Sequence, residues 1–119
     1  MITLRTAKEA PVVAEEQKIV EDQGLRYVAV PVTAETFSLA DVDNVRKALE
    51  EAGEAPVLLH CASSNRVGAV WGVIARERGA SAEEAEDEAK KAGLSSAAMR
   101  DAFRKVAAEA AARAAASNP

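Results

Sequence analysis

The chain is poor in several residue types that define whole classes of protein. It has one cysteine, one histidine and only 3 % aromatic residues among 119 residues. A single cysteine cannot form an internal disulfide, so nothing points to an oxidising compartment and we expect a cytoplasmic location. The formal net charge is −4 at pH 7. We therefore expect no nucleic-acid partner, because such binding rests on clustered cations that displace counterions.

Long apolar runs and metal-ligand clusters are also absent. No window reaches the roughly 18 apolar residues that a bilayer span requires, so we expect no membrane partner. The start of the chain, 1–5, lacks the basic region and long apolar stretch of a secretory leader. His60 and Cys61 are adjacent, but a zinc site would need carboxylates that the pattern does not place beside them. We expect neither a metal nor another cofactor.

What the chain does have is an alternation of strand-like and helix-like segments. Strands are expected over 2–5, 27–32 and 56–60, and helices over 8–23, 38–52, 67–78, 81–92 and 95–116. This order predicts an α/β fold with a largely parallel central sheet flanked by helices. The third strand is the most apolar, so we expect it at the centre of the sheet. Ile19 and Trp71 are expected to face inward from their helices.

The domain organisation follows from length and composition. At this length we expect one α/β domain over residues 1–105, followed by an alanine-rich helix and tail over 106–119. The tail favours helix but buries little, so its end should fray. Ser38 with Asp41 is typical of a capped helix start. Pro31 is expected either to end the second strand or to lie where the sheet needs no donor.

The segment from Cys61 to Arg66 carries the chemistry. It follows an apolar strand and opens a helix, and ligands of parallel sheets gather at the carboxyl ends of the strands. The backbone amides from Ala62 to Arg66 can converge on an anion, and the same field favours a thiolate at Cys61. The guanidinium of Arg66 can hold two oxygens of an oxyanion. The sequence thus predicts a phosphate- or other oxyanion-binding loop.

The remaining polar residues of this loop support it. Ser63, Ser64 and Asn65 offer hydroxyl or amide hydrogen bonds to the loop, to the sulfur or to the substrate. His60 should point away from Cys61 on the strand, because side chains alternate. We expect His60 to buttress the loop rather than to act as a base.

The loop and its flanks resemble a known family. His60-Cys61-x-x-x-x-Arg66 is similar to the active-site loop of cysteine-dependent phosphatases, and most closely to the phosphatase-like domain of beta-lactamase-hydrolase-like proteins. The supporting segments are Ile2–Arg5, Gly24–Val28 leading into Pro31–Thr33, and Val57–Ala69. The resemblance covers about residues 2–96. It implies a dual-specificity-phosphatase-like fold in which Cys61 attacks the phosphorus, Arg66 clamps the phosphate and a phosphocysteine forms and is hydrolysed.

Three departures from the family pattern bear on this implication. Four residues separate Cys61 from Arg66, where tyrosine phosphatases have five, and rhodanese-type sulfurtransferases share the shorter loop. Val67 replaces the usual Ser or Thr, and Ser64 stands where relatives tend to carry glycine, at a cost of about 1–2 kcal/mol if its backbone is left-handed. The strand–helix unit with which the family's domain starts is missing, so a homodimer could cover the exposed sheet edge.

A phosphatase also needs a general acid for the leaving oxygen. The resemblance places it on a loop upstream of the cysteine, where Glu35, Asp41 and Asp43 are available. Glu35 is the candidate, because Asp41 and Asp43 fall in the first turn of a helix.

Three functions remain open from the sequence. The favoured one is a cysteine-dependent phosphatase that hydrolyses a phosphate monoester. The second is a rhodanese-like sulfur-transfer or persulfide domain that uses the same cysteine. The third is a non-catalytic relic that binds an anion or a partner.

Overall fold

The computed structural model describes residues 1–6, 8 and 13–117 as an α/β fold. Its elements are β1 (Ile2–Thr3), α1 (Val13–Asp22), β2 (Val28–Ala29), α2 (Leu39–Ala52), β3 (Leu59–His60), α3 (Asn65–Glu77), α4 (Ala82–Lys91) and α5 (Ala97–Ser117). The first helix was expected to start at residue 8, which lies in a turn, and residues 9–12 lie outside the described residues. The three strands are parallel, as expected, and shorter than the sequence indicates.

The sheet has the order β2-β1-β3, so β1 is its central strand. Ile2 lies opposite Val28 on one side and opposite Leu59 on the other. The expectation that the third strand is central was therefore wrong. An apolar sequence indicates that the faces of a strand are buried, but it does not indicate whether the strand pairs with one neighbouring strand or with two. β3 packs Leu59 against the core while Leu58 stays 57 % exposed.

The two edges of the sheet differ. On the β2 edge, Val30 and Val32 donate to the carbonyls of Thr3 and Leu4, so the intervening Pro31 faces away from the sheet. Pro31 therefore lies where no donor is needed, as predicted. On the other edge, the carbonyls of residues 58 and 60 accept from β1, which directs the main chain of Leu59 outward. No strand within the described residues pairs with that side.

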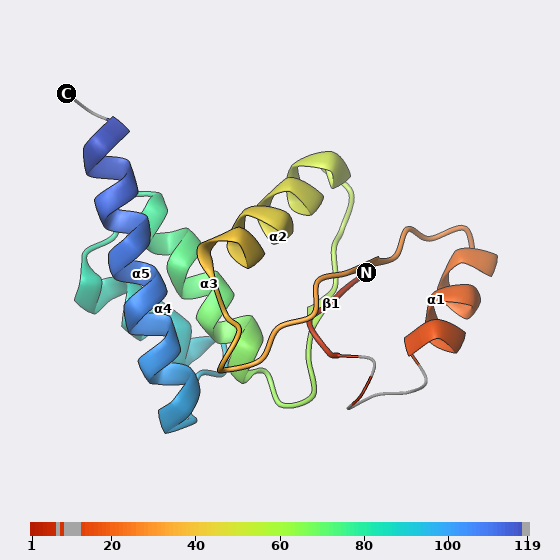
Figure 1. The fold of residues 1–119 in the computed structure, drawn as a ribbon. Helices are drawn as coiled ribbons and strands as arrows, with labels where there is room; N and C mark the ends of the chain where they lie inside the picture. Colours follow the sequence, from red (N-terminus) through yellow and green to blue (C-terminus); the bar gives the residue numbers. More distant parts are fainter. Residues whose placement is uncertain (7, 9–12, 118–119) are drawn as a thin grey trace.

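Helices cover both faces of the sheet. Figure 1 shows α1 alone on one side and α2 to α5 on the other. Ile2 and Leu4 belong to the hydrophobic core that α2, α3 and α5 cover. Thr3 has the opposite orientation, because side chains alternate along a strand, and it is fully buried. The α1 side is thus lined partly by polar side chains.

Two inward-facing predictions were wrong. Ile19 is 62 % exposed and Trp71 is 40 % exposed, whereas Val20, Val70 and Ile74 are buried. Trp71 lines a cavity together with Val57 and Ile74. Helical periodicity places both residues at the margin of the apolar stripe, where neighbouring elements decide whether they are covered.

Close packing of α3 against α4 and α5 depends on two glycines of α3. A Cβ on Gly68 would lie 2.6 Å from the carbonyl oxygen of Ala89 and the amide nitrogen of Leu94. A Cβ on Gly72 would lie 2.6 Å from the ring of Phe103. The missing side chains let the backbones approach and fix the start of α3 relative to the start of α5.

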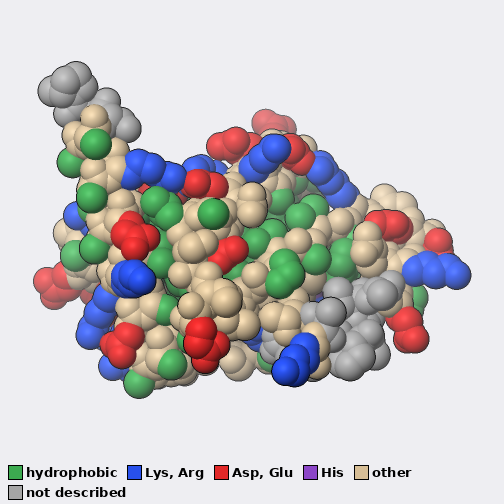
Figure 2. Space-filling view, viewed as in Figure 1, with side chains coloured by type: hydrophobic (Ala, Val, Ile, Leu, Met, Phe, Trp, Pro, Cys, Tyr) green, Lys and Arg blue, Asp and Glu red, His purple; other side chains and the backbone are tan. Residues whose placement is uncertain are grey.

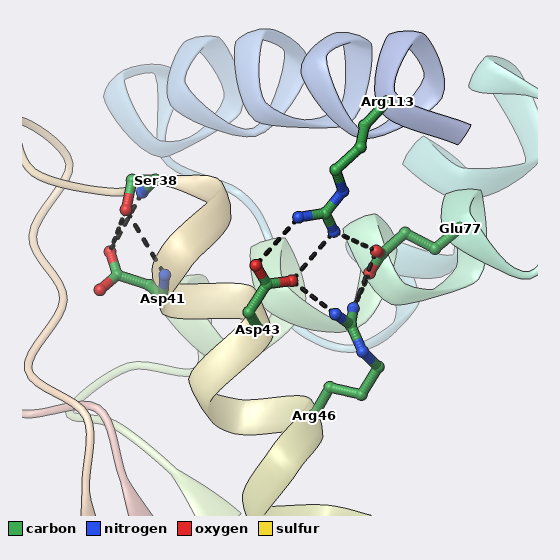
Figure 3. Close-up of polar contacts among 6 residues, drawn as sticks. All are labelled: Ser38, Asp41, Asp43, Arg46, Glu77 and Arg113. Carbon is green, nitrogen blue, oxygen red and sulfur yellow. Dashed lines mark hydrogen bonds and ion pairs between the residues drawn. The ribbon is translucent and has the colours of Figure 1, made fainter. Parts of the chain in front are cut away.

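A network of ion pairs joins α2, α3 and the distal part of α5 (Figure 3). Asp43 accepts from both terminal nitrogens of Arg113 at 2.9 Å, and Arg113 also bonds Glu77 at 2.9 Å. Arg46 bonds Glu77 at 2.7 Å and Asp43 at 2.5 Å. Helix α5 is continuous from Ala97 to Ser117, so it crosses the expected boundary between residues 105 and 106 without interruption. That division stays a prediction.

The surface seen from the direction of Figure 1 is mixed in charge. Figure 2 shows acidic and basic side chains interspersed over this face, with apolar side chains between them. Within residues 1–6, 8 and 13–117, no helix is both long enough and apolar enough to cross a membrane.

Candidate active site

The Cys61–Arg66 loop lies between the end of β3 and the start of α3, at the carboxyl ends of the parallel strands. β3 ends at His60 and α3 begins at Asn65, so four residues make the turn. Within the described part of the chain, the backbone amides of Ala62, Ser63 and Ser64 donate to no protein acceptor. Amides of this kind at a helix start are available to an anion.

Ser64 adopts a left-handed backbone, with φ of 67° and ψ of −2°. It is the only non-glycine residue with positive φ among the described residues. The backbone cost that the sequence attached to this condition therefore applies, about 1–2 kcal/mol. Ser64 precedes α3 without a side-chain capping bond, so the strain has no local compensation from its hydroxyl.

Arg66 turns its guanidinium along the strand ends. Its Nη1 donates to the carbonyl of Val32 at 3.0 Å and to that of Leu4 at 3.4 Å. Leu4 and Val32 lie just beyond the ends of β1 and β2, and the side chain of Arg66 is half-buried. The arginine is thereby held in one place at the carboxyl edge of the sheet, next to the loop.

A cavity of about 360 Å³ opens beside the loop, and we call it the loop cavity. It is lined by Thr6, Thr33, Ala34, Ser63, Asn65, Arg66, Ser96 and Met99. Four of the eight lining residues carry a hydroxyl group, and Arg66 contributes a guanidinium. The structure thus brings the predicted Ser63, Asn65 and Arg66 together on one hollow.

Five lining residues were not among the predicted site residues: Thr6, Thr33, Ala34, Ser96 and Met99. Thr6 and Thr33 follow β1 and β2, and the rule that ligands gather at strand ends could have found them. Ser96 and Met99 are far away in the sequence and reach the cavity only because α5 packs on α3. No sequence pattern carries that information.

Cys61 lies outside the lining of the loop cavity. It is half-buried and packs against the hydrophobic core. His60 lies on the other face, where its Nε2 is 3.5 Å from Glu16 Oε1 but makes no hydrogen bond. The two side chains therefore point to opposite faces, as predicted. Loop support by His60 stays a prediction.

Burial lowers the pKa of His60, and the nearby Arg5 guanidinium lowers it further, against the opposing effect of Glu16. The imidazole is thus held in its neutral form below α1. Arg5 itself bonds Glu16 and Thr3. This polar group lies behind the loop, on the far side of the sheet from the core.

The acid candidates are placed differently from one another. Asp41 forms the capping box of α2 with Ser38, and Asp43 belongs to the ion-pair network (Figure 3). Glu35 is exposed on a turn whose neighbours Thr33 and Ala34 line the loop cavity. Glu35 belongs neither to the capping box nor to the ion-pair network. Its role as general acid stays a prediction.

Within the described ranges, no group of three or more His, Cys, Asp or Glu side chains could hold a metal ion.

The parallel sheet, flanked by helices and with an edge strand that ends in this loop, makes the chain an α/β domain. The sequence model of the family described as "Beta-lactamase hydrolase-like protein, phosphatase-like domain" matches residues 4–79, and the chain belongs to this family. The match includes β2, β3, the loop and α3, so the resemblance seen in the sequence is confirmed.

Solved structures are similar in fold. Two crystal structures of a DUF442 protein from Shewanella putrefaciens CN-32, named as a candidate phosphatase, superpose with TM-scores of 0.67 and 0.70. Both are 19 % identical to this chain. They cover 91 % and 94 % of it, and 72 % and 70 % of their own chains are matched. No curated protein matches the chain significantly.

Proposed function

We propose that the chain is a cysteine-dependent phosphatase that hydrolyses a phosphate monoester. The observation that carries the proposal is the set of amides without protein acceptors, from Ala62 to Ser64, beside the fixed guanidinium of Arg66. A phosphoryl group bound at the Cys61–Arg66 loop would accept from those amides and from the arginine together, which stabilises a developing negative charge. Family membership supports the same chemistry.

The reaction has two displacements. The Cys61 thiolate attacks phosphorus, the bond to the ester oxygen breaks, and the leaving alcohol takes a proton. Water then attacks the phosphocysteine, the P–S bond breaks, the thiolate is restored and inorganic phosphate leaves. Two easier steps thereby replace one difficult step.

The test compares Cys61→Ser and Arg66→Lys with wild type on 4-nitrophenyl phosphate. We expect Cys61→Ser to abolish both turnover and the phosphocysteine adduct, which mass spectrometry of the rapidly quenched wild type should detect. Arg66→Lys should lower kcat/KM by about a hundredfold, because the planar fork is lost. The matched control is Arg104→Lys, since Arg104 pairs with Glu86 on the α4–α5 surface. Full activity in Cys61→Ser would refute the mechanism.

We assign the general acid to Glu35, which the turn beside Thr33 and Ala34 carries. Glu35→Gln should slow substrates with poor leaving groups more than 4-nitrophenyl phosphate, because a good leaving group departs without a proton. Glu54→Gln, another exposed glutamate, is the control. Equal effects on both classes of substrate would contradict this assignment.

A second candidate function has its own observation. Cys61 packs on the core and does not line the loop cavity, which favours a module that binds an oxyanion without reacting with it. Such a module would bind phosphate with unchanged affinity in Cys61→Ser and would not turn over any ester.

Cyanide-dependent release of thiocyanate would instead indicate the rhodanese-like alternative.

We further propose that the open β3 edge is covered by a second copy of the chain. The exposed Leu58 and the outward main chain of Leu59 lie on that edge, while Pro31 blocks the other. A cytoplasmic location remains part of the proposal.

A further inference from the structure

The side chain of Asn65 makes a three-way connection. Its Oδ1 accepts hydrogen bonds from the backbone amides of Ser95 and Ser96, both at 2.7 Å, and from the Ser95 hydroxyl at 3.4 Å. Its Nδ2 donates to the Ser63 hydroxyl at 3.3 Å. One amide group therefore joins the loop to the segment that begins α5.

The groups that Asn65 joins are walls of the loop cavity. Ser63 lines the cavity from the loop, and Ser96 lines it from the start of α5. Ser96 also caps α5, since its hydroxyl accepts from the Met99 amide at 3.1 Å, and Met99 is itself a lining residue. The position of Ser96 and Met99 relative to the loop thus depends on the bonds to Asn65.

A second close contact reinforces this connection. Gly93 has φ of +124°, and a Cβ there would lie 2.5 Å from Ser64 Cβ and 2.8 Å from the Ser64 carbonyl oxygen. The turn before α5 therefore rests directly on the strained residue of the loop. Loosening of this turn would remove the packing that holds Ser64 in its left-handed conformation.

We propose that Asn65 is a positioning residue that couples the anion site to the start of α5. It holds Ser63 and Ser96 on the same cavity and keeps the loop amides converged. An anion on the loop should in turn stabilise the turn and the first residues of α5. This inference rests on the proposed function, because it assumes that the loop binds an oxyanion.

The experiment measures orthovanadate binding by calorimetry, and hydrogen exchange of residues 93–99 with and without vanadate. Asn65→Ala should weaken binding about tenfold or more and abolish the vanadate-dependent protection of residues 93–99. Asn65→Asp retains an acceptor for the two serine amides but loses the donor to Ser63. It should keep the wild-type unfolding midpoint and still bind vanadate more weakly. Asn44→Ala, on the exposed side of α2, is the matched control.

The outcomes separate three situations. Weakened vanadate binding together with loss of the vanadate-dependent protection of residues 93–99 in Asn65→Ala, with Asn44→Ala unchanged, supports the coupling; in Asn65→Asp the added negative charge weakens vanadate binding by itself. A lowered unfolding midpoint in Asn65→Ala with vanadate affinity within about twofold of wild type overturns it, because the role is then structural alone. Failure of the wild-type chain to bind vanadate overturns the proposed function, and the coupling with it.

Discussion

At the scale of single residues, Ser64 is the most strained position that the structure describes. Its φ of 67° is one that glycine adopts at little cost. Ser64→Gly should raise the free energy of unfolding by about 1 kcal/mol, after allowance for the greater freedom of glycine in the unfolded chain. Chemical denaturation measures the change.

Ser63→Gly is the matched control, because Ser63 has no positive φ. Glycine there should destabilise by about 0.5–1 kcal/mol. A loss of stability in Ser64→Gly equal to that in Ser63→Gly would contradict the strain at Ser64.

His60 gives the chain a specific pH dependence. Its folded pKa is lowered from 6.5, first by burial and then by Arg5, so the unfolded state takes up the proton more readily. Stability should therefore fall as pH drops below 6.5, and the loss should be complete below the lowered folded pKa. Above 6.5 the imidazole is neutral in both states and contributes no slope.

Urea denaturation at pH 7.5 and at about pH 5 measures this slope, and His60→Gln should remove it. The assignment is clean because the chain has one histidine. An unchanged slope in His60→Gln would show that carboxylates account for the dependence.

At the scale of elements, the network of Asp43, Arg46, Glu77 and Arg113 fixes the distal part of α5. Asp43→Asn should lower the free energy of unfolding by about 0.5–1 kcal/mol at low salt, since exposed ion pairs are each worth little. The loss should shrink in 1 M NaCl because salt screens exposed charges. Asp87→Asn, on the exposed face of α4, should have no comparable effect.

The same network adds a second pH window. The Arg113 hydrogen bond, with that of Arg46, holds the pKa of Asp43 below its ordinary value of 3.8. Its contribution is present above 3.8 and is lost as pH falls through the lower folded pKa. The wild type and Asp43→Asn should therefore converge in stability in strong acid.

Local signals made some elements predictable from the sequence. The capping boxes at Ser38 and Ser81 place the starts of α2 and α4 correctly, and the glycines after the helices adopt positive φ. The loop could be predicted because its chemistry is contiguous in the chain. Strand order could not be predicted, since hydrophobicity does not indicate how many neighbours a strand has. The last helix, expected from residue 95, is capped by Ser96 and begins at Ala97.

The candidate site was predictable only on its sequence-local side. Ser63, Asn65 and Arg66 follow from the motif, but Ser96 and Met99 enter through the packing of α5 on α3. The function of Asn65 in that packing was hidden for the same reason. Its partners lie 30 and 31 residues further along the chain.

At the scale of the whole molecule, the open β3 edge bears on assembly. We expect wild type to sediment with twice the mass of the 12.5 kDa chain. Leu58→Glu should give a monomer, because it places a charge on the apolar edge. Ile19→Glu, at an equally exposed residue of α1, should stay dimeric. A wild-type monomer at every concentration measured would refute the second-copy proposal.

The glycines of α3 have a consequence for the order in which the molecule forms. They allow α3, α4 and α5 to associate tightly through contacts that are near in sequence, whereas the short strands must meet across long stretches of chain. We expect such local contacts to form early in folding, and the sheet to dock afterwards on the helical unit. The loop lies between the sheet and this helical unit. We therefore expect the proposed anion site to form in the last step of folding and to be lost in the first step of unfolding, before the C-terminal helices separate.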